Sequence, residues 1–166
     1  MSTEKNLEAA FSGESEANRK YLAFAKQADK ENHPKIAKLF RAAAAGETVH
    51  AHAHLRALGN INSTAENLKS AMEGESYEFK NMYPDYIAEA QKDENRAAEI
   101  AFKNAMAVEQ VHYSMYSEAL KRLGNGEEIQ IGKVFVCSVC GNLVLDEAPE
   151  KCPVCGAPAS KFDEVE

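Results

Sequence analysis

Apolar residues recur at helical spacings through the first three-quarters of the chain. Between residues 3 and 31 they lie three or four positions apart, at Leu7, Ala10, Phe11, Ala17, Tyr21, Phe24 and Ala28. This spacing predicts a helix over residues 3–31. A second helix is predicted at 34–58, because Pro34 suits a first helical turn and Gly59 provides a stop.

The same periodicity predicts two more helices before residue 124. Ser63-Thr64-Ala65-Glu66 has the form of a capping box and opens the third helix. Pro84 lies inside that helix and is expected to bend it or end it locally, since proline lacks a backbone donor. Asp93 is expected to cap the fourth helix, which runs to Leu123 and stops at Gly124-Asn125-Gly126.

Acidic and histidine motifs appear twice. Gly13-Glu14-Ser15 recurs as Gly74-Glu75-Ser76, and Glu47-x-x-His50 recurs as Glu109-x-x-His112. The first offset is 61 residues (75 − 14) and the second is 62 (109 − 47), so one extra residue is expected to be absorbed in a turn. The repeat predicts a duplicated helical hairpin.

The repeated motifs supply four carboxylates and two imidazoles. In each Glu-x-x-His pair the two side chains share one helix face, because residues three apart are neighbours on a helix. Glu14 and Glu47 lie at similar depths in their hairpin, ~26 Å and ~20 Å from the turn at 1.5 Å per residue. Oxygen and imidazole ligands favour iron or manganese, and ferritin-like di-iron proteins hold two metal ions with this ligand pattern.

Glu78 breaks the symmetry of the repeat. It lies one helical turn after Glu75, whereas its counterpart in the first half is Ala17 (78 − 61). An additional anion would offset the charge that a di-iron pair gains on oxidation. We therefore hypothesise that one iron exchanges ligands with redox state, between His50 when reduced and Glu78 when oxidised.

The C-terminal region carries a different metal motif. Cys137-x-x-Cys140 and Cys152-x-x-Cys155 are separated by eleven residues (141 to 151), which is a strong signal for one tetrahedral metal site. The spacing alone fits a zinc ribbon and a one-iron redox centre equally well. The neighbouring di-metal motif favours iron, because a two-electron reaction benefits from a one-electron relay.

Composition divides the chain and limits its partners. All four cysteines lie after residue 134, so we expect a helical domain at 1–124, a hinge at 125–133 and a four-cysteine domain at 134–166. The net charge of −7 argues against nucleic acid and anionic membranes. Without an evident secretory signal or membrane-length apolar run, a cytoplasmic location is expected, where cysteine pairs are metal ligands more often than disulfides.

Together these motifs resemble the rubrerythrin family over nearly the whole chain. The residues that carry the resemblance are Gly13-Glu14-Ser15, Glu47-x-x-His50, Gly74-Glu75-Ser76-x-Glu78, Met82-Tyr83-Pro84, Glu109-x-x-His112 and the two Cys-x-x-Cys-Gly knuckles. The resemblance implies a mainly α fold, a ferritin-like four-helix bundle followed by a small rubredoxin-like domain. It also implies an NAD(P)H-linked peroxidase that reduces hydrogen peroxide to water.

The resemblance also implies roles for individual residues. Glu14 would be a terminal ligand of the first iron, Glu75 and His112 terminal ligands of the second, and Glu47 and Glu109 bridging ligands. His50 and Glu78 would be the alternating ligands, with Tyr21 and Tyr83 as catalytic tyrosines beside the site. Cys137, Cys140, Cys152 and Cys155 would hold a third iron. The family further implies a head-to-tail homodimer that receives electrons from rubredoxin or an NAD(P)H-dependent reductase.

Three other functions compete with the peroxidase. A ferritin-like iron-oxidising or iron-storage protein would share the bundle, although the four-cysteine tail argues against it. A metal-sensing adaptor would use the tail as a zinc ribbon. Oxygenase chemistry on an organic substrate is a third alternative, for which the sequence offers no pocket signal.

Overall fold

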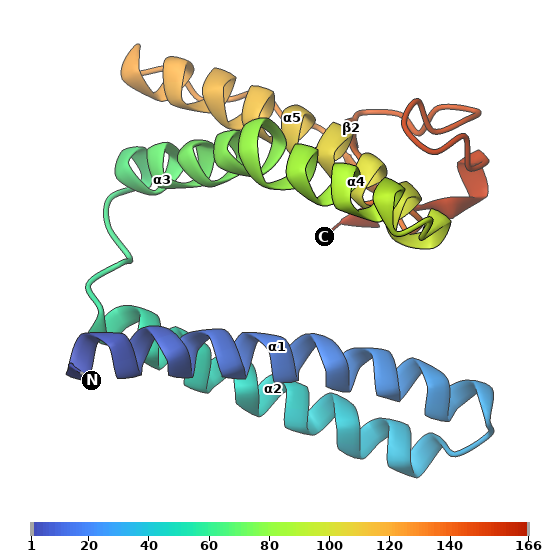
Figure 1. The fold of residues 1–166 in the computed structure, drawn as a ribbon. Coiled ribbons are helices and arrows are strands. Elements are labelled where there is room, and N and C mark those ends of the chain that lie inside the picture. Colours follow the sequence, from blue (N-terminus) through green and yellow to red (C-terminus); the bar gives the residue numbers. More distant parts are fainter. Residues whose placement is uncertain (1, 166) are drawn as a thin grey trace. The chain divides into compact units, whose positions relative to one another are not determined.

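The computed structural model describes residues 2–165 and is mainly helical, with a four-helix region followed by a small three-stranded sheet (Figure 1). Residues group into two compact units, Met1–Asn62 and Ser63–Glu166. The first unit contains one helical hairpin. The second contains the other hairpin and the cysteine-rich tail.

Helices α1 (Thr3–Lys30) and α2 (Pro34–Ala57) form the hairpin of the first unit. Pro34 occupies the first turn of α2, as predicted. Small side chains fill the contact near the hairpin turn and allow the two helices to approach closely. This buried cluster consists of Ala25, Ala28 and Ala37, with Phe40 packed against it.

The second hairpin pairs a composite helix with one long helix. Helix α3 (Thr64–Tyr77), a π-helical turn η1 (Glu78–Met82) and helix α4 (Tyr83–Lys92) follow one another without a break (Figure 1). All three pack against α5 (Arg96–Gly124). The predicted helices are therefore present, and the predicted interruption near Pro84 takes the form of the π turn.

Two predictions about helix ends have different outcomes. The capping box at Ser63 is confirmed, since the Glu66 side chain accepts a hydrogen bond from the Ser63 backbone N–H at 3.1 Å. The prediction that Asp93 caps the fourth helix is wrong. Asp93 ends α4, and the connecting turn continues through Glu94, which has a positive φ of 53°. Asn95 caps α5, because its Oδ1 accepts the Ala98 N–H at 3.1 Å.

The extra residue of the second repeat lies in η1, so the turn that was expected to absorb it is a π-helical turn within a continuous helix. The offset is still 61 between Ser15 and Ser76 (76 − 15) but has become 62 between Tyr21 and Tyr83 (83 − 21). One residue inserted into a continuous helix is accommodated by a wider turn, in which the Tyr83 N–H bonds the Glu78 carbonyl five residues back. After this turn, the two hairpins are again in phase.

The tail forms an antiparallel sheet around a central strand. β1 (Val134–Cys137) pairs with β2 (Leu143–Leu145) on one side and with β3 (Phe162–Val165) on the other. A short 3₁₀ turn, η2 (Ala159–Lys161), leads into β3. So small a sheet buries little apolar surface, and a bound metal would supply the missing stability.

The tail contacts the helical hairpin of its own unit through a glycine. Gly141 has a φ of +84°, which favours glycine, and a Cβ built there would lie 3.9 Å from Cγ1 of Val108 on α5. Val108 is only 2% exposed. The first cysteine knuckle therefore packs closely on α5, at the residue before Glu109.

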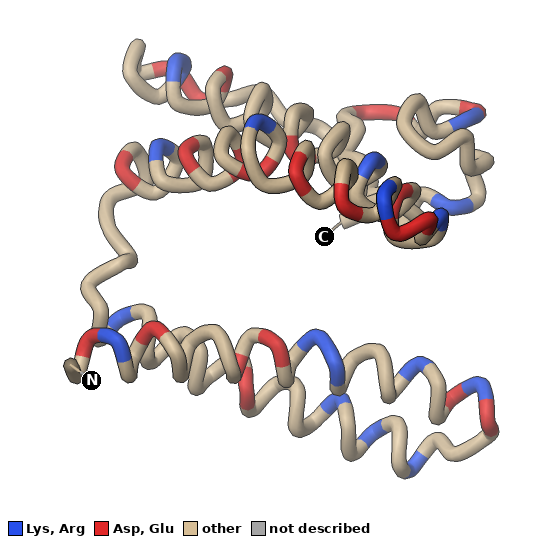
Figure 2. Tube along the Cα trace, in the orientation of Figure 1, with Lys and Arg blue, Asp and Glu red and all other residues tan. Residues whose placement is uncertain are grey.

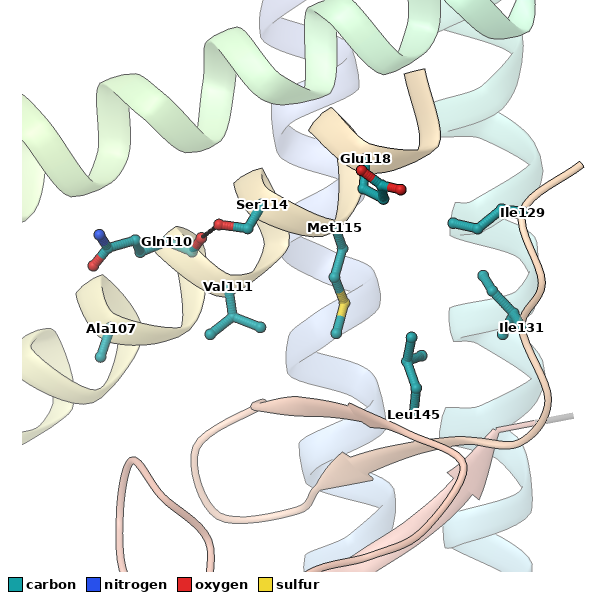
Figure 3. A pocket seen from close by; sticks show the side chains of 9 residues that line it. All are labelled: Ala107, Gln110, Val111, Ser114, Met115, Glu118, Ile129, Ile131 and Leu145. Carbon is teal, nitrogen blue, oxygen red and sulfur yellow. Dashed lines mark hydrogen bonds between the residues drawn. The ribbon is translucent and has the colours of Figure 1, made fainter. Parts of the chain in front are cut away.

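A largely apolar cavity of about 540 Å³ lies between α5, the connecting segment and β2 (Figure 3). Ser114 does not add polarity to it, because its hydroxyl donates to the Gln110 carbonyl at 2.9 Å. Glu118 is the one charged lining residue, and it pairs with Arg122 at 2.7 Å.

Charged residues of both signs are interspersed along the helices of each unit (Figure 2). None of the helices in the described range 2–165 combines the length and the apolar character that crossing a membrane requires.

Candidate metal centres

The first hairpin brings three predicted ligands together. Glu14 comes from α1, and Glu47 and His50 come from α2; one candidate ligand atom from each lies within 4.8 Å of the others. The His50 Nδ1 lies 2.9 Å from Glu47 Oε2 and 3.8 Å from Glu14 Oε2. We call these three residues the first half-site.

The second hairpin repeats this geometry. Glu75 from α3 joins Glu109 and His112 from α5, again with ligand atoms within 4.8 Å of one another. The His112 Nδ1 lies 2.8 Å from Glu109 Oε2 and 3.5 Å from Glu75 Oε1. These residues form the second half-site, and in both half-sites the imidazole presents Nδ1 to two carboxylates.

The two half-sites differ in exposure. The His50 side chain is 59% exposed, whereas that of His112 is 20% exposed. The His112 Nε2 is buried and has no hydrogen-bond partner among residues 2–165. Within its own unit, the histidine of the first half-site is therefore more accessible than its counterpart.

The pKa values of the carboxylates in the two half-sites are shifted in opposite directions. Burial and the neighbouring Glu109 and Glu78 carboxylates raise the pKa of Glu75 to about 7. In the first half-site, hydrogen bonds with Glu14 and His50 lower the pKa of Glu47. Without metal, the second half-site therefore retains a proton near neutral pH, while Glu47 is ionised.

Glu78 and Tyr83 lie beside the second half-site, outside its three-residue cluster. Burial and the Glu109 charge raise the pKa of Glu78, and the His112 charge opposes them. Burial, with the charges of Glu109, Glu78 and Glu75, also raises the pKa of Tyr83. Both groups are thereby favoured in their protonated forms.

Tyr116 also interacts electrostatically with the second half-site. Its pKa is raised by burial and by the charges of Glu75 and Glu109. It lies one helical turn after His112 on α5, and this spacing was the signal that could have identified it.

Tyr21 belongs to an aromatic cluster that occurs in both hairpins. Its ring lies 6.4 Å from Phe24 and 6.2 Å from Phe40, and those two rings are 5.6 Å apart. The second hairpin has the equivalent contacts at 6.3, 6.2 and 5.5 Å, made by Tyr83, Tyr86 and Phe102. Each residue pair is offset by 62, so the repeat could have revealed Phe40 and Phe102 as supports of the two tyrosines.

The donor set of each half-site fits a divalent metal ion. Within the described chain, the ion pairs found for these four carboxylates are with the half-site histidines. Clustered carboxylates are costly to bury without a positive charge. Carboxylate oxygens and imidazole nitrogen suit iron or manganese, and a metal at Nδ1 would supply the missing charge.

The four cysteines form a separate thiol cluster in the tail. The Cys137 and Cys155 sulfurs are 3.7 Å apart and those of Cys140 and Cys152 are 3.6 Å apart, without disulfide bonds. One ligand atom from each residue lies within 4.8 Å of the other three. The arrangement fits a tetrahedral iron or zinc ion.

Two matching knuckles build this cluster. The Gly141 N–H bonds the Cys137 carbonyl at 2.8 Å, and the Gly156 N–H bonds the Cys152 carbonyl at 2.9 Å. Burial raises the pKa of the Cys152 thiol, but backbone N–H groups of Cys155 and Val154 outweigh it and lower the pKa to about 7. The lowered pKa makes the Cys152 thiol easier to deprotonate to the thiolate that binds a metal ion.

Comparison with known proteins identifies the family. The Rubrerythrin family model matches residues 5–120, and the model described as "Rubrerythrin, rubredoxin-like domain" matches residues 135–163. Rubrerythrin-2 of Clostridium acetobutylicum is 36% identical, with alignment over 94% of this chain and 92% of that protein. Nigerythrin of Nitratidesulfovibrio vulgaris is 34% identical over 97% of this chain and 85% of its own length.

Solved structures give the same result. A mixed-valence nigerythrin structure is similar with a TM-score of 0.58 and 34% identity, covering 99% of this chain and 87% of that one. A fully reduced, all-ferrous nigerythrin structure has the same TM-score. The chain belongs to the rubrerythrin family, whose ferritin-like di-iron domain is followed by a rubredoxin-like domain.

Proposed function

We propose that this protein is a non-haem di-iron peroxidase that reduces hydrogen peroxide to water. The reaction is H₂O₂ + 2 H⁺ + 2 e⁻ → 2 H₂O. The observation that carries the proposal is the repeated Glu, Glu, His geometry of the two half-sites, on a chain that also carries a four-thiol site. Family membership supports the substrate and the metal.

The two half-sites would together hold two iron ions. Glu14 would be terminal on one iron, Glu75 and His112 terminal on the other, and Glu47 and Glu109 would bridge. His50 and Glu78 would alternate as ligands with redox state. Two ferrous ions, when bound, supply the two electrons that cleavage of the O–O bond requires.

The surrounding side chains would bind and orient peroxide. Tyr83 is protonated at neutral pH, as tyrosines ordinarily are, and its raised pKa reinforces this, so its hydroxyl is a donor beside the second half-site. Glu78, with its raised pKa, can hold a second proton there. Tyr21 would act from the first hairpin, where its ring is fixed against Phe24 and Phe40.

Electrons would enter through an iron bound to the four cysteines. The contact between Gly141 and Val108 supports this role, because it joins the thiol site to the helix that carries Glu109. Rubredoxin or an NAD(P)H-dependent reductase would be the donor. A cytoplasmic location is proposed as well, because four cysteines clustered as metal ligands are typical of reducing compartments.

We also propose a homodimer, as the family resemblance implies. In a head-to-tail dimer, the cysteine-bound iron of one subunit would serve the di-iron site of the other, whereas the contact at Val108 offers a route within one chain. Mixed dimers of Cys152→Ser and Glu109→Ala chains separate these routes. Donor-linked turnover in mixed dimers would indicate transfer between subunits, and inactivity would indicate transfer within one chain.

The decisive test is stopped-flow mixing of anaerobically reconstituted, fully reduced protein with peroxide and, separately, with air. Fast oxidation by peroxide and slow oxidation by air are expected. The reverse order would support an iron-oxidising protein instead. Metal analysis completes the test. Zinc in the tail after native purification would favour the metal-sensing adaptor. A variant with Glu14, Glu47, Glu75 and Glu109 all changed to Ala should bind no iron in its helical region.

A further inference from the structure

A buried amide joins α1 to α2 beside the first half-site. Asn18 is 8% exposed, and its Nδ2 donates to the Ala44 carbonyl at 2.7 Å and to Thr48 Oγ1 at 2.9 Å. The Thr48 hydroxyl in turn donates to the Ala44 carbonyl at 3.2 Å. One side chain from α1 is therefore hydrogen-bonded to two positions, one turn apart, on α2.

These bonds connect the turns that carry two metal ligands. Asn18 lies one helical turn after Glu14, and Thr48 directly follows Glu47. A shift of α1 along α2 would have to break both bonds from Nδ2. The same shift would change the separation of the Glu14 and Glu47 carboxylates, so the bonds and the ligand geometry are linked.

Stability alone is a poor explanation for Asn18. Its Oδ1 is buried without a hydrogen-bond partner in the described part of the chain. An unsatisfied buried acceptor costs about 1–3 kcal/mol, similar to the gain from the two bonds that Nδ2 makes. An apolar residue would fill this space without that cost, so the amide is better explained by the specific alignment it imposes.

The second hairpin has no amide at the position equivalent to Asn18. The residue offset by 61 from Asn18 is Phe79, whose ring packs on Tyr113 at a centroid distance of 5.7 Å. Aromatic packing is less directional than a pair of hydrogen bonds to fixed backbone and hydroxyl positions. The hydrogen-bonded connection thus belongs to the half-site whose histidine is the more exposed.

We propose that Asn18 is a positioning residue, which holds Glu14 and Glu47 at the relative depth that metal binding in the first half-site requires. It acts through the two helices and is not itself a ligand. The proposal rests on the metal-binding role of the half-sites proposed above. Loss of a residue that orients metal ligands typically weakens metal binding about 10–100-fold.

The test compares two leucine variants of the full-length protein, with Zn²⁺ first bound to the four cysteines. Asn18→Leu removes the connection, and Phe79→Leu changes the equivalent position of the other hairpin. Mn²⁺ binding is followed by the electron paramagnetic resonance signal of the free ion, and the melting temperature of the metal-free protein is recorded. Asn18→Leu is expected to weaken binding of one Mn²⁺ by about 10-fold or more. Phe79→Leu should change the melting temperature with less effect on Mn²⁺.

Two milder variants refine the test. Thr48→Val removes the hydroxyl that Asn18 and Ala44 contact but keeps the bond from Asn18 Nδ2 to the Ala44 carbonyl. It should therefore weaken Mn²⁺ binding less than Asn18→Leu does. Thr48→Val also replaces Asn18→Leu in the Mn²⁺-binding test if Asn18→Leu does not fold. Ser15→Ala is the matched control, because the Ser15 hydroxyl bonds only the Phe11 carbonyl of its own helix in the contacts described, and Mn²⁺ binding should not change.

Unchanged Mn²⁺ affinity in Asn18→Leu or Thr48→Val, with a lower melting temperature, would overturn the proposal and leave Asn18 a purely structural residue. Wild-type protein that binds no Mn²⁺ would overturn the metal-binding role as well. Wild-type protein that binds Mn²⁺ but, with iron, does not react with peroxide would refute only the peroxidase, since the Asn18 comparison uses metal affinity alone.

Discussion

The two hairpins share their candidate metal ligands but differ in the residues that support them. His50 and His112 each present Nδ1 to two carboxylates at nearly equal distances. Around this repeated chemistry, the first hairpin has regular helices and the Asn18 connection, and the second has the π turn η1. Ligand geometry has thus been kept through the duplication while the scaffolds diverged.

The ends of the hairpins near the helix-connecting turns show the same divergence. Ala37 is completely buried in the first hairpin, and its counterpart at an offset of 62 is Glu99. The Glu99 carboxylate accepts hydrogen bonds from Gln91 at 2.9 Å, Arg96 at 2.7 Å and Lys103 at 2.6 Å. A charged network therefore joins α4 to α5 where alanine packing joins α1 to α2.

The largest expected effect comes from making the second hairpin regular. Deletion of Asn81 shortens η1 to the length of the first repeat and leaves Pro84 inside a continuous α-helix. Proline there removes a backbone bond and crowds the preceding turn, so the unfolding free energy of the metal-free protein should fall by about 3 kcal/mol. Denaturant unfolding monitored by circular dichroism measures this loss.

A second change should rescue the deletion. The counterpart of Pro84 in the first hairpin is Leu22 (84 − 62), so Pro84→Leu combined with the deletion recreates the regular first-hairpin pattern. Most of the lost stability should return, because leucine donates the missing bond and favours helix. If the double variant is no more stable than the deletion alone, η1 and Pro84 are not coupled.

A smaller effect is expected from replacing Glu75, and this effect should depend on pH. The folded-state pKa of Glu75 is raised to about 7, so its stabilising contribution is complete below its unfolded pKa near 4.5 and is lost as pH rises through about 7. Metal-free Glu75→Gln, which mimics the protonated acid, should match the wild-type melting temperature at pH 5 and exceed it by about 2–4 °C at pH 8.

Glu47→Gln is the matched control in the first hairpin. The folded-state pKa of Glu47 is lowered, so its contribution is present above the unfolded pKa and is lost as pH falls. This variant should melt below wild type at pH 8, opposite in sign to Glu75→Gln. Equal signs for the two variants would remove the electrostatic distinction between the half-sites.

The smallest effect is expected at Glu99. Its three hydrogen-bond donors lower its pKa to about 2, so the stability it contributes is present above about pH 4.5 and is lost as pH falls toward 2. Glu99→Gln should lower the melting temperature at pH 7 by about 2 °C, with a smaller difference at pH 3. Ala37→Ser, at the alanine counterpart, should show no such pH dependence.

The sequence allowed the ligands to be predicted because they repeat with a fixed spacing. Glu14, Glu47 and His50 meet in one cluster, and Glu75, Glu109 and His112 meet in another. The helices and the capping box at Ser63 also followed from local periodicity and cap chemistry. The roles of these residues on iron remain predictions.

Features that depend on tertiary packing could not be predicted in the same way. The extra residue was expected in a turn, but sequence spacing does not distinguish a loop insertion from a π turn within a helix. Asn95 replaced Asp93 as the cap because the turn takes two more residues. Asn18 has no recognisable motif, and its partners on α2 are 26 and 30 residues away.

The seating of the first cysteine knuckle on Val108 has a consequence for protein engineering. A chimera that exchanges only the C-terminal 33 or so residues would place a new knuckle against Val108 of α5. Donor-specific variants are better made by transplanting α5 together with the tail, because the helix surface and the knuckle that packs on it then come from the same protein.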